Sequence, residues 1–476
     1  MKSESDCGVL MSCSRSLHAQ LFGLASMMAV IFWMTCCATL PEGDTQPPKP
    51  DPAEAEAQLK AAADRSDLIR LHGIFELYPL QRPAYGSSGE IADESATDPL
   101  ADSDELPTHD ISWNPIVRVN LFAMNPPQQL TLQAHEGNIA VQAAGRPAQL
   151  TAGPGEPLQL QADGNLVILQ SGTRQTEAGQ FDIHTEASGL VRAIHPEKPW
   201  RYYRGSLRIE ARNNQLQLIN YVTLEDYVSS VVGSEMNFMN PEALKVQAVI
   251  SRTYAVWNSG RSTSAAGYDL NDSVLNQVYL GELITSPRFR EAAYATSGEV
   301  LSWSGELILA AYHSTCGGQT AANETVWSGA PLPWLRGAED FGSCSASPHF
   351  RWRFEVPAAE LHELFNTNGI RVENGSGQDR ASVVYLSKGS GYETIGANAF
   401  RLRFNQRYGT LALRSTHFRL EEDGETYIFE GRGLGHGIGL CQWGALGKAE
   451  AGWNYRDILR FYYNGADLSR LPEPQP

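Results

Sequence analysis

The residues around Glu235 are compatible with acid–base chemistry. Met236, Phe238 and Met239 follow it closely. Apolar neighbours that bury a carboxyl group disfavour its charged form and raise its pKa towards that of a general acid. The alternative interpretation is a solvated glutamate at a turn between two helices, with no chemical role.

The first of these helices is expected directly ahead of Glu235. Apolar residues recur with helical period from 224 to 232, where Thr223 can act as the N-cap and Gly233 can end the helix. Glu235 is therefore expected on a tight connection between two helices.

The second helix is expected to begin at Asn240, which can cap it, with Pro241 in the first helical position. Lys245 and Arg252 lie two turns apart on one face of this helix. Their positive charges could orient a substrate, but unscreened charge near Glu235 would lower its pKa. Burial would have to outweigh that effect for Glu235 to act as an acid.

Cysteine and histidine residues form a second candidate site. His313 with Cys316, and Cys344 with His349, have spacings that a tetrahedral zinc site could use. A disulfide between Cys316 and Cys344 is the competing interpretation, and Cys441 could replace one histidine as a ligand. Four protein ligands would make the zinc structural, because a catalytic zinc site keeps one position open.

The stretch Gly431–Gly439 has glycine at every second residue, with His436 between two of them. Such a run lets the backbone approach a ligand or another strand closely, or simply forms a tight turn. Its spacing matches neither the dinucleotide fingerprint nor the P-loop, so it gives no support for nucleotide binding.

The charge of the chain is strongly negative and unevenly distributed. Its formal value of −17 argues against a nucleic-acid partner. Residues 42–110 alone contain 16 acidic and 5 basic residues, a net charge of −11. Because residues 41–110 are also rich in Pro and Ala, we interpret them as an extended acidic spacer.

Residues 1–40 are expected to be a signal peptide or a membrane anchor. The uncharged run Leu21–Leu40 follows basic residues, as in export signals. Cys36 and Cys37 lie where a lipoprotein would carry its modified cysteine, so a lipoprotein is a further alternative. The expected location is the periplasm or the outer face of the cytoplasmic membrane.

The fold class expected for the remainder is α+β. Residues 111–219 contain short alternating runs separated by turn residues and predict a β-rich part with an insertion. Strand-like runs return from Val383 to Phe429, and residues 445–463 predict closing helices. The helical hairpin around Glu235 would pack with these β-rich subdomains.

Taken together, these segments resemble the SpoIID/LytB family, named for stage II sporulation protein D and for an enhancer of a cell-wall amidase. The matching segments follow the family's order over Val117–Leu468, and residues 220–468 would be the catalytic core. They are Glu225–Val228, Val232–Met236, Pro241–Ala248, Ser251–Tyr254, His313–Gly318, Val326–Trp327, Gly431–Ala445 and Ile458–Gly465.

The resemblance implies a peptidoglycan lytic transglycosylase that prefers glycan strands stripped of their stem peptides, with Glu235 as its acid and base. Lys245, Arg252, His436 and Gln442 fall in family motifs and would be expected near the glycan. Some members hold zinc and others do not, so zinc and the disulfide both stay open. The alternative function is a non-catalytic, glycan-binding enhancer of a partner amidase.

The chain departs from the family pattern at two places. Asn237 stands where the family often has proline after methionine, and the β-rich stretch 129–199 lies outside the motifs. The role of that stretch stays open, and the sequence gives no reason to infer sporulation.

Overall fold

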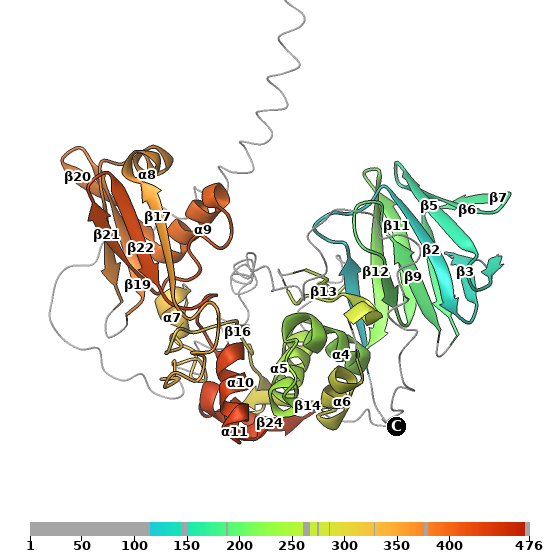
Figure 1. Ribbon diagram of the computed structural model, residues 1–476. Helices are drawn as coiled ribbons and strands as arrows, with labels where there is room; N and C mark the ends of the chain where they lie inside the picture. Colours follow the sequence, from blue (N-terminus) through green and yellow to red (C-terminus); the bar gives the residue numbers. More distant parts are fainter. Residues whose placement is uncertain are drawn as a thin grey trace, which may run out of the picture. The chain divides into compact units, whose positions relative to one another are not determined.

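The computed structural model describes residues 115–471 apart from 145, 147–149, 187–188, 260–266, 274–275, 285, 328 and 376–378 (Figure 1). The expected signal peptide or anchor at 1–40 and the spacer at 41–110 lie outside the described residues. Among the described residues, no helix combines the length and apolarity that a membrane span requires. The described part is α+β, as predicted.

Two antiparallel sheets form the first part of the described chain. The seven-stranded sheet has the order β13-β1-β12-β11-β8-β3-β4, and the six-stranded sheet has the order β10-β9-β2-β5-β6-β7; only β13 runs parallel to its neighbour. Strands β5 and β6 of one sheet contact β11 of the other. The bounds are β1 Ile116–Leu121, β2 Gln129–Glu136, β3 Ile139–Ala143, β4 Leu150–Ala152, β5 Pro157–Asp163, β6 Leu166–Ser171, β7 Arg174–Ala178, β8 Gln180–Thr185, β9 Leu190–Ile194, β10 Arg201–Tyr203, β11 Ser206–Arg212, β12 Gln215–Thr223 and β13 Leu270–Asn271.

These strands form because apolar and polar residues alternate along them. In β5, Leu158, Leu160 and Ala162 are buried while the residues between them are exposed. Alternation of this kind buries one face of each sheet. The stretch 129–199, whose role was open, supplies strands to both sheets and is therefore an integral part of this β-rich unit.

The helical hairpin follows β12 directly. Helix α4 spans Leu224–Glu235 and α5 spans Pro241–Ser259. The expectation that Gly233 ends the first helix is wrong, because the helix continues for two more residues and includes Glu235. Asn240 does cap α5, since its side-chain oxygen accepts the backbone N–H of Glu242 at 2.9 Å.

A buried ion pair joins α4 to α5. The guanidinium of Arg252 is fully buried and donates to both carboxylate oxygens of Glu225, at 2.8 and 2.5 Å. It also donates to the carbonyls of Ala293 and Glu299 at 2.8 and 3.1 Å. One guanidinium thereby fixes α4 and α5 against α6 (Pro287–Ala295) and the start of β14 (Glu299–Trp303).

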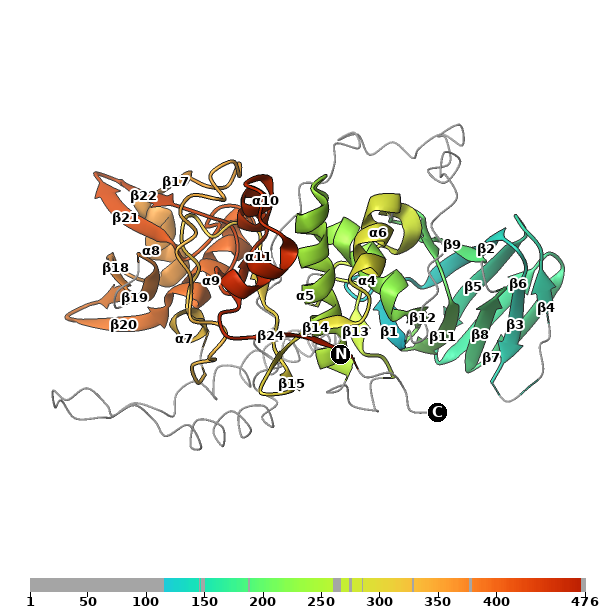
Figure 2. The ribbon, with the colours of Figure 1, turned by 90° about the horizontal axis from the view of Figure 1, so that it is seen from below.

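The remaining elements that pack around the helical hairpin come from the chain before and after residues 352–431. Helices α10 and α11 contact α5, and both views show them beside it (Figures 1 and 2). They confirm the closing helices that the sequence predicts. The bounds are η2 Gly281–Ile284, β15 Glu306–Leu307, β16 Tyr312–His313, α7 Asn323–Val326, β23 Leu440–Cys441, α10 Gln442–Glu450, α11 Tyr455–Tyr462 and β24 Asp467–Arg470.

Residues 352–431 form a subdomain with a hydrophobic cluster of its own. It holds two three-stranded sheets, in the orders β17-β22-β21 and β18-β19-β20. The interpretation of residues 383–429 as strand-like missed α9, whose apolar face, including Phe400 and Phe404, packs in this cluster. The bounds are β17 Trp352–Pro357, α8 Ala358–Phe365, β18 Ile370–Asn374, β19 Ala381–Lys388, β20 Gly391–Gly396, α9 Ala397–Tyr408, β21 Phe418–Asp423 and β22 Thr426–Gly431.

Replacing Arg252 by Met is expected to lower the free energy of unfolding by about 3–5 kcal/mol, because it leaves the Glu225 carboxylate buried without its partner. The matched control is Lys245→Met on the same helix, where the ion pair with Glu242 is partly exposed and is expected to contribute less than about 1 kcal/mol. Urea unfolding of both variants measures the difference, and equal losses would contradict this account.

Candidate active site

Glu235 is the last residue of α4 and lies partly buried at its C-terminal end. One carboxyl oxygen accepts the backbone N–H of Val278 at 2.8 Å, and the carboxyl group is also hydrogen-bonded to the Tyr312 side chain. Both partners are neutral groups. The predicted acid therefore sits among hydrogen-bond donors that carry no formal charge.

The electrostatic setting of Glu235 favours its protonated form. Burial raises its pKa to about 7, although the hydrogen bonds from Val278 and Tyr312 act in the opposite direction. The C-terminal end of a helix carries partial negative charge, which opposes ionisation of a carboxyl group there. Glu235 can therefore hold a proton near neutral pH, as a general acid must.

A buried polar chain supports the groups around this carboxyl. Tyr227 of α4 donates to the side-chain oxygen of Gln277 at 3.1 Å, and the Gln277 amide lies 3.5 Å from the Tyr312 hydroxyl. All three side chains are buried. This chain fixes the positions of Tyr312 and of the loop that carries Val278.

The glycine-rich loop lies along the segment that carries Tyr312. Strands β16 and β23 pair in parallel, and a Cβ at Gly439 would lie 2.0 Å from the Ala311 carbonyl oxygen. Only glycine, at a positive φ of 69°, allows this approach. The interpretation of the run as a place of close backbone approach therefore fits the structure.

His436 and Gln442 contact the backbone of the site. His436 is buried; its Nε2 donates to the Tyr312 carbonyl at 2.9 Å and its Nδ1 accepts the Ile438 N–H at 3.0 Å. The Gln442 amide donates to the Glu235 carbonyl at 3.1 Å. Both were expected near the glycan; in the structure both are buried and bond the backbone of Tyr312 and Glu235.

Lys245 and Arg252, the two basic residues of α5, are not among the groups that bond the Glu235 carboxyl group, which are Val278 and Tyr312. Arg252 was expected near the glycan, but it is fully buried and ion-paired with Glu225, so no surface of it can meet a ligand. Lys245 is partly exposed and forms an ion pair with Glu242 at 2.7 Å. Neither cation acts on the pKa of Glu235, so the conflict between nearby positive charge and an acid role does not arise.

Four buried side chains form a compact cluster whose ligand atoms all lie within 4.8 Å of one another: Cys316, Asp340, Cys344 and Cys441. The three cysteines are free, with the sulfurs of Cys316 and Cys344 3.4 Å apart. Cys441 enters through the β16–β23 pairing, in which it faces His313. The structure therefore places Cys441, the alternative to a histidine, in the cluster, and it contains no disulfide between the described cysteines.

The two histidines expected as ligands lie outside this cluster, which corrects the predicted ligand set. His313 interacts through Nδ1 with the Ile438 carbonyl at 3.1 Å, and His349 accepts through Nδ1 from Arg414 at 3.0 Å. The sequence spacing identified the right loops. It could not show which side chains of those loops point towards each other.

Burial and hydrogen bonds shift the pKa values of the three thiols in the cluster. Burial raises the pKa of the Cys316 and Cys441 thiols, whereas hydrogen bonds from these two thiols lower the pKa of Cys344. Backbone N–H groups also point at the sulfurs, including that of Gly318 to Cys316 at 3.3 Å. Sulfurs that accept N–H bonds are stabilised as thiolates, which are the form that binds metal.

The sequence interpretation missed Asp340. Its carboxylate accepts from the Tyr462 hydroxyl at 2.5 Å and pairs with Lys448 at 3.2 Å. Burial raises its pKa to about 6. Its position four residues before Cys344 was the available signal. Tyr312 was also missed, although it directly precedes the His313 motif.

Comparisons with known proteins match the part of the chain that carries Glu235. The family profile described as Stage II sporulation protein matches residues 212–303, which run from the end of β11 to the end of β14. The profile therefore covers α4, α5 and α6, including Glu235 and the Arg252–Glu225 pair.

Three curated relatives extend the similarity. An uncharacterised protein of Brachyspira hyodysenteriae is 29% identical over 267 residues, covering 56% of this chain and 72% of the relative. Stage II sporulation protein D of Bacillus subtilis is 28% identical over 268 residues, covering 53% and 76%. The amidase enhancer of Bacillus subtilis is 30% identical over 281 residues, covering 48% of this chain and 38% of that longer protein. Residues 212–303 thus form a domain of the SpoIID/LytB family, and the chain is similar to these proteins over about half of its length.

Proposed function

We propose that this protein is a lytic transglycosylase that cleaves peptidoglycan glycan strands, preferring strands without stem peptides. The observation that carries the proposal is the Glu235 carboxyl group, partly buried at the end of α4 with a pKa raised to about 7. The names of the relatives, a sporulation protein and an amidase enhancer, support a role at the cell wall.

The proposed reaction uses one carboxyl group twice. Protonated Glu235 donates its proton to the glycosidic oxygen as the bond from that oxygen to C1 of N-acetylmuramic acid breaks. The C6 hydroxyl of the same sugar then attacks C1, and the Glu235 carboxylate accepts the hydroxyl proton. The products are a new hydroxyl end and a 1,6-anhydro end, and Glu235 regains its proton.

The polar surroundings of Glu235 fit a reaction with a single acid. Glycosidases that use water generally require a second carboxylate across the scissile bond. Among the described residues, the groups that act on the pKa of Glu235 are the Val278 N–H and Tyr312. No second carboxylate is among them.

Aromatic side chains next to the acid could receive a sugar ring. Phe238 and Trp443 pack edge to face with their ring centres 5.1 Å apart, and both are partly exposed. Trp443 directly follows Gln442, whose amide contacts the Glu235 backbone. We assign this aromatic pair to the glycan-binding surface, because apolar sugar faces pack on aromatic rings.

We further propose a structural zinc ion held by Cys316, Asp340, Cys344 and Cys441. Three sulfurs and one carboxylate oxygen within 4.8 Å of one another form a four-ligand set of types that zinc accepts. When bound, zinc would cross-link the 316–344 segment to β23. Its role would be stability, because all four positions would be occupied by protein.

The proposed location follows the sequence interpretation: the protein would be exported and act in the periplasm or on the outer face of the cytoplasmic membrane. A cell-wall amidase is the proposed partner, because removal of stem peptides would supply the preferred substrate. A purely non-catalytic enhancer role is the competing function, and the similarity to the amidase enhancer is what favours it.

Glu235→Gln is expected to reduce formation of 1,6-anhydro products from stripped glycan strands by about 100- to 10,000-fold, the usual contribution of a general acid–base group. The control is Glu291→Gln, which removes an exposed carboxylate on α6. Products are identified by mass spectrometry. Strands that bind tightly to both variants and to the unmodified protein without being cleaved would favour the enhancer role.

The rate is expected to fall as the pH rises above about 7, because Glu235 must be protonated to donate and its pKa is about 7. Tyr312→Phe removes a hydrogen bond that lowers this pKa, so the alkaline fall should move to higher pH. Initial rates measured from pH 5 to 9 test this, with the exposed Tyr392→Phe as control. A shift to lower pH would contradict the assigned hydrogen bond.

Cys344→Ala is expected to lose bound zinc and to lower the melting temperature. His349→Ala is expected to keep the metal, because its side chain bonds Arg414 outside the cluster. Elemental analysis of protein purified without chelator distinguishes the two ligand sets. Zinc lost from His349→Ala but kept by Cys344→Ala would overturn the assignment.

A further inference from the structure

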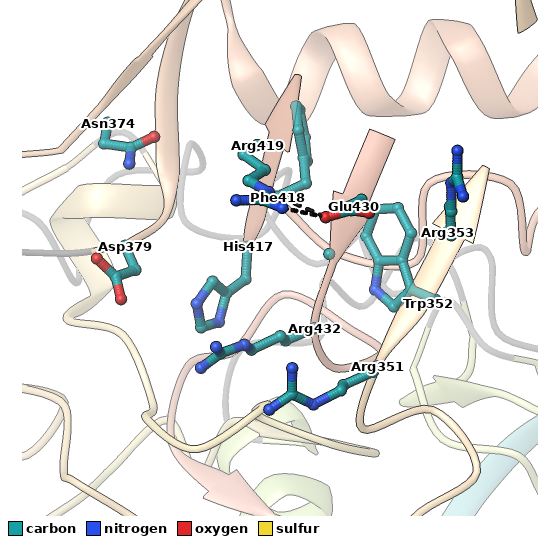
Figure 3. A pocket seen from close by; sticks show the side chains of 11 residues that line it. Arg351, Trp352, Arg353, Asn374, Asp379, His417, Phe418, Arg419, Glu430 and Arg432 are labelled. Carbon is teal, nitrogen blue, oxygen red and sulfur yellow. Dashed lines mark hydrogen bonds and ion pairs between the residues drawn. The ribbon is translucent and has the colours of Figure 1, made fainter. Parts of the chain in front are cut away.

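The 352–431 subdomain contains an open pocket of about 570 Å³ at one end of the β17-β22-β21 sheet (Figure 3). Four arginines line it against two carboxylates: Arg351, Arg353, Arg419, Arg432, Asp379 and Glu430. The pocket is thus positively charged in a chain whose formal net charge is −17. A local excess of this sign attracts anions.

The strand register divides these charges into two rows. Arg353 of β17 and Arg419 of β21 both lie opposite Glu430 of the central strand β22. Arg419 donates to Glu430 at 3.0 Å, and Arg353 pairs with Glu355 at 2.8 Å. The positive charges of this first row are therefore matched by carboxylates of the protein.

The second row lies two residues further along each strand. Arg351 directly precedes Trp352 and Arg432 directly follows Gly431, the residues that pair at this end of β17 and β22, and the Arg432 N–H donates to the His417 carbonyl at 2.8 Å. Residues two apart on a strand face the same side of a sheet. Arg351, Arg432 and His417 therefore extend the first row at the end of the pocket, where Figure 3 shows all three side chains.

No ion pair joins Arg351 or Arg432 to a carboxylate within the described ranges. Two guanidinium groups brought into one row repel each other unless an anion lies between them. The guanidinium fork matches a carboxylate in geometry and binds it through two parallel hydrogen bonds. The second row is therefore built to receive an anionic group from outside the described chain.

Aromatic side chains line the pocket beside this charged row. Trp352 and Phe418 flank Gly431 on its two neighbouring strands. A Cβ at Gly431 would lie 2.1 Å from the Trp352 ring, so the indole can pack here only because residue 431 is glycine. The Trp352 Nε1 is fixed by the Gly433 carbonyl at 2.9 Å. Trp352 and Phe418 are buried in the hydrophobic cluster of the subdomain, so they hold the backbone beside the exposed Arg351 and Arg432 in place.

We propose that Arg351 and Arg432 bind a carboxylate carried by the glycan strand, namely the lactyl carboxylate of an N-acetylmuramic acid residue. This inference rests on the proposed function. Hydrolysis of the amide bond between the lactyl group and the stem peptide adds water across that bond, leaving a carboxylate on the sugar and an amine on the peptide. The pocket would therefore recognise a charge that only a stripped strand exposes.

The same glycine-rich loop serves both regions. Arg432 lies near its start and Gln442, which contacts the Glu235 backbone, lies just after its end. A polymer carries a lactyl group on every second sugar, so one strand can present one residue to Glu235 and another to this pocket. The pocket would then select the strand, and Glu235 would cut it.

The test compares binding of stripped glycan strands to the full chain with Arg351→Gln/Arg432→Gln and with the control Arg371→Gln/Arg407→Gln. Both control arginines are exposed residues of the same subdomain outside the pocket, so the net charge changes equally. All three proteins carry Glu235→Gln to prevent cleavage. The pocket variant should bind at least tenfold more weakly, while the control binds like the parent.

A second ligand tests the carboxylate itself. Strands whose lactyl carboxylates have been converted to methylamides keep their length but lose the charge. The parent should bind them as weakly as the pocket variant binds unmodified strands. Equal affinity for charged and methylamidated strands, equal binding by pocket and control variants, or tighter binding of a poly(glycerol phosphate) than of stripped strands would each overturn the proposal.

This outcome is independent of catalysis. Binding that depends on Arg351 and Arg432 without 1,6-anhydro products from the protein with intact Glu235 would defeat the transglycosylase proposal and leave the carboxylate site standing. Glu235-dependent products together with unchanged binding by the pocket variant would support the transglycosylase proposal and defeat the carboxylate site. Circular dichroism of the variants confirms that each has folded.

Discussion

The short parallel contact between β16 and β23 is the interaction on which both parts of the site depend. It places Tyr312 beside Leu440 and His313 beside Cys441. Through Tyr312 it completes the hydrogen bonding of Glu235, and through Cys441 it completes the buried cluster with Cys316. At Gly439 this contact leaves no room for a Cβ, and a Cβ at Gly431, Gly433, Gly435 or Gly437 would also meet other neighbouring residues too closely. The glycine run is therefore a structural requirement of the site.

Two carboxyl groups on one helix show how the fold sets charge. Glu225 begins α4 next to Arg252, and Glu235 ends it without a cation among the groups that act on its pKa. Glu225 is buried in an ion pair with the Arg252 guanidinium, whereas burial raises the pKa of Glu235 to about 7. One end of the helix thereby anchors the hairpin and the other carries a carboxyl group that can hold a proton. The two carboxyl groups differ because Glu225 faces the Arg252 guanidinium, whereas Glu235 is bonded by the neutral Val278 N–H and Tyr312.

The local elements could be predicted from the sequence, because their signals are contained within a few residues. The strand alternation in the first 100 described residues, the cap at Asn240 and the closing helices are of this kind. Glu235 was predicted as the acid from its apolar neighbours and the family motif. Side-chain roles were less accessible: Arg252 and His436 occupy family motifs, yet both are buried. Asp340 joins the cysteines only through packing of distant segments, which no local pattern records. The same limit applies to Arg351 and Arg432, which become neighbours through strand register.

The separation of β16 from β23 along the chain has a consequence for folding. His313 and Ile438, which hydrogen-bond in the finished structure, lie 125 positions apart. Between them, residues 352–431 close on a hydrophobic cluster of their own, which shortens the loop that has to be closed. Because the entropy of closing a loop grows only with the logarithm of its length, doubling the length of this loop would cost about 0.6 kcal/mol. The subdomain can thus be lengthened, trimmed or exchanged in the course of evolution while the contact that assembles Glu235, Tyr312 and the cysteine cluster stays the same.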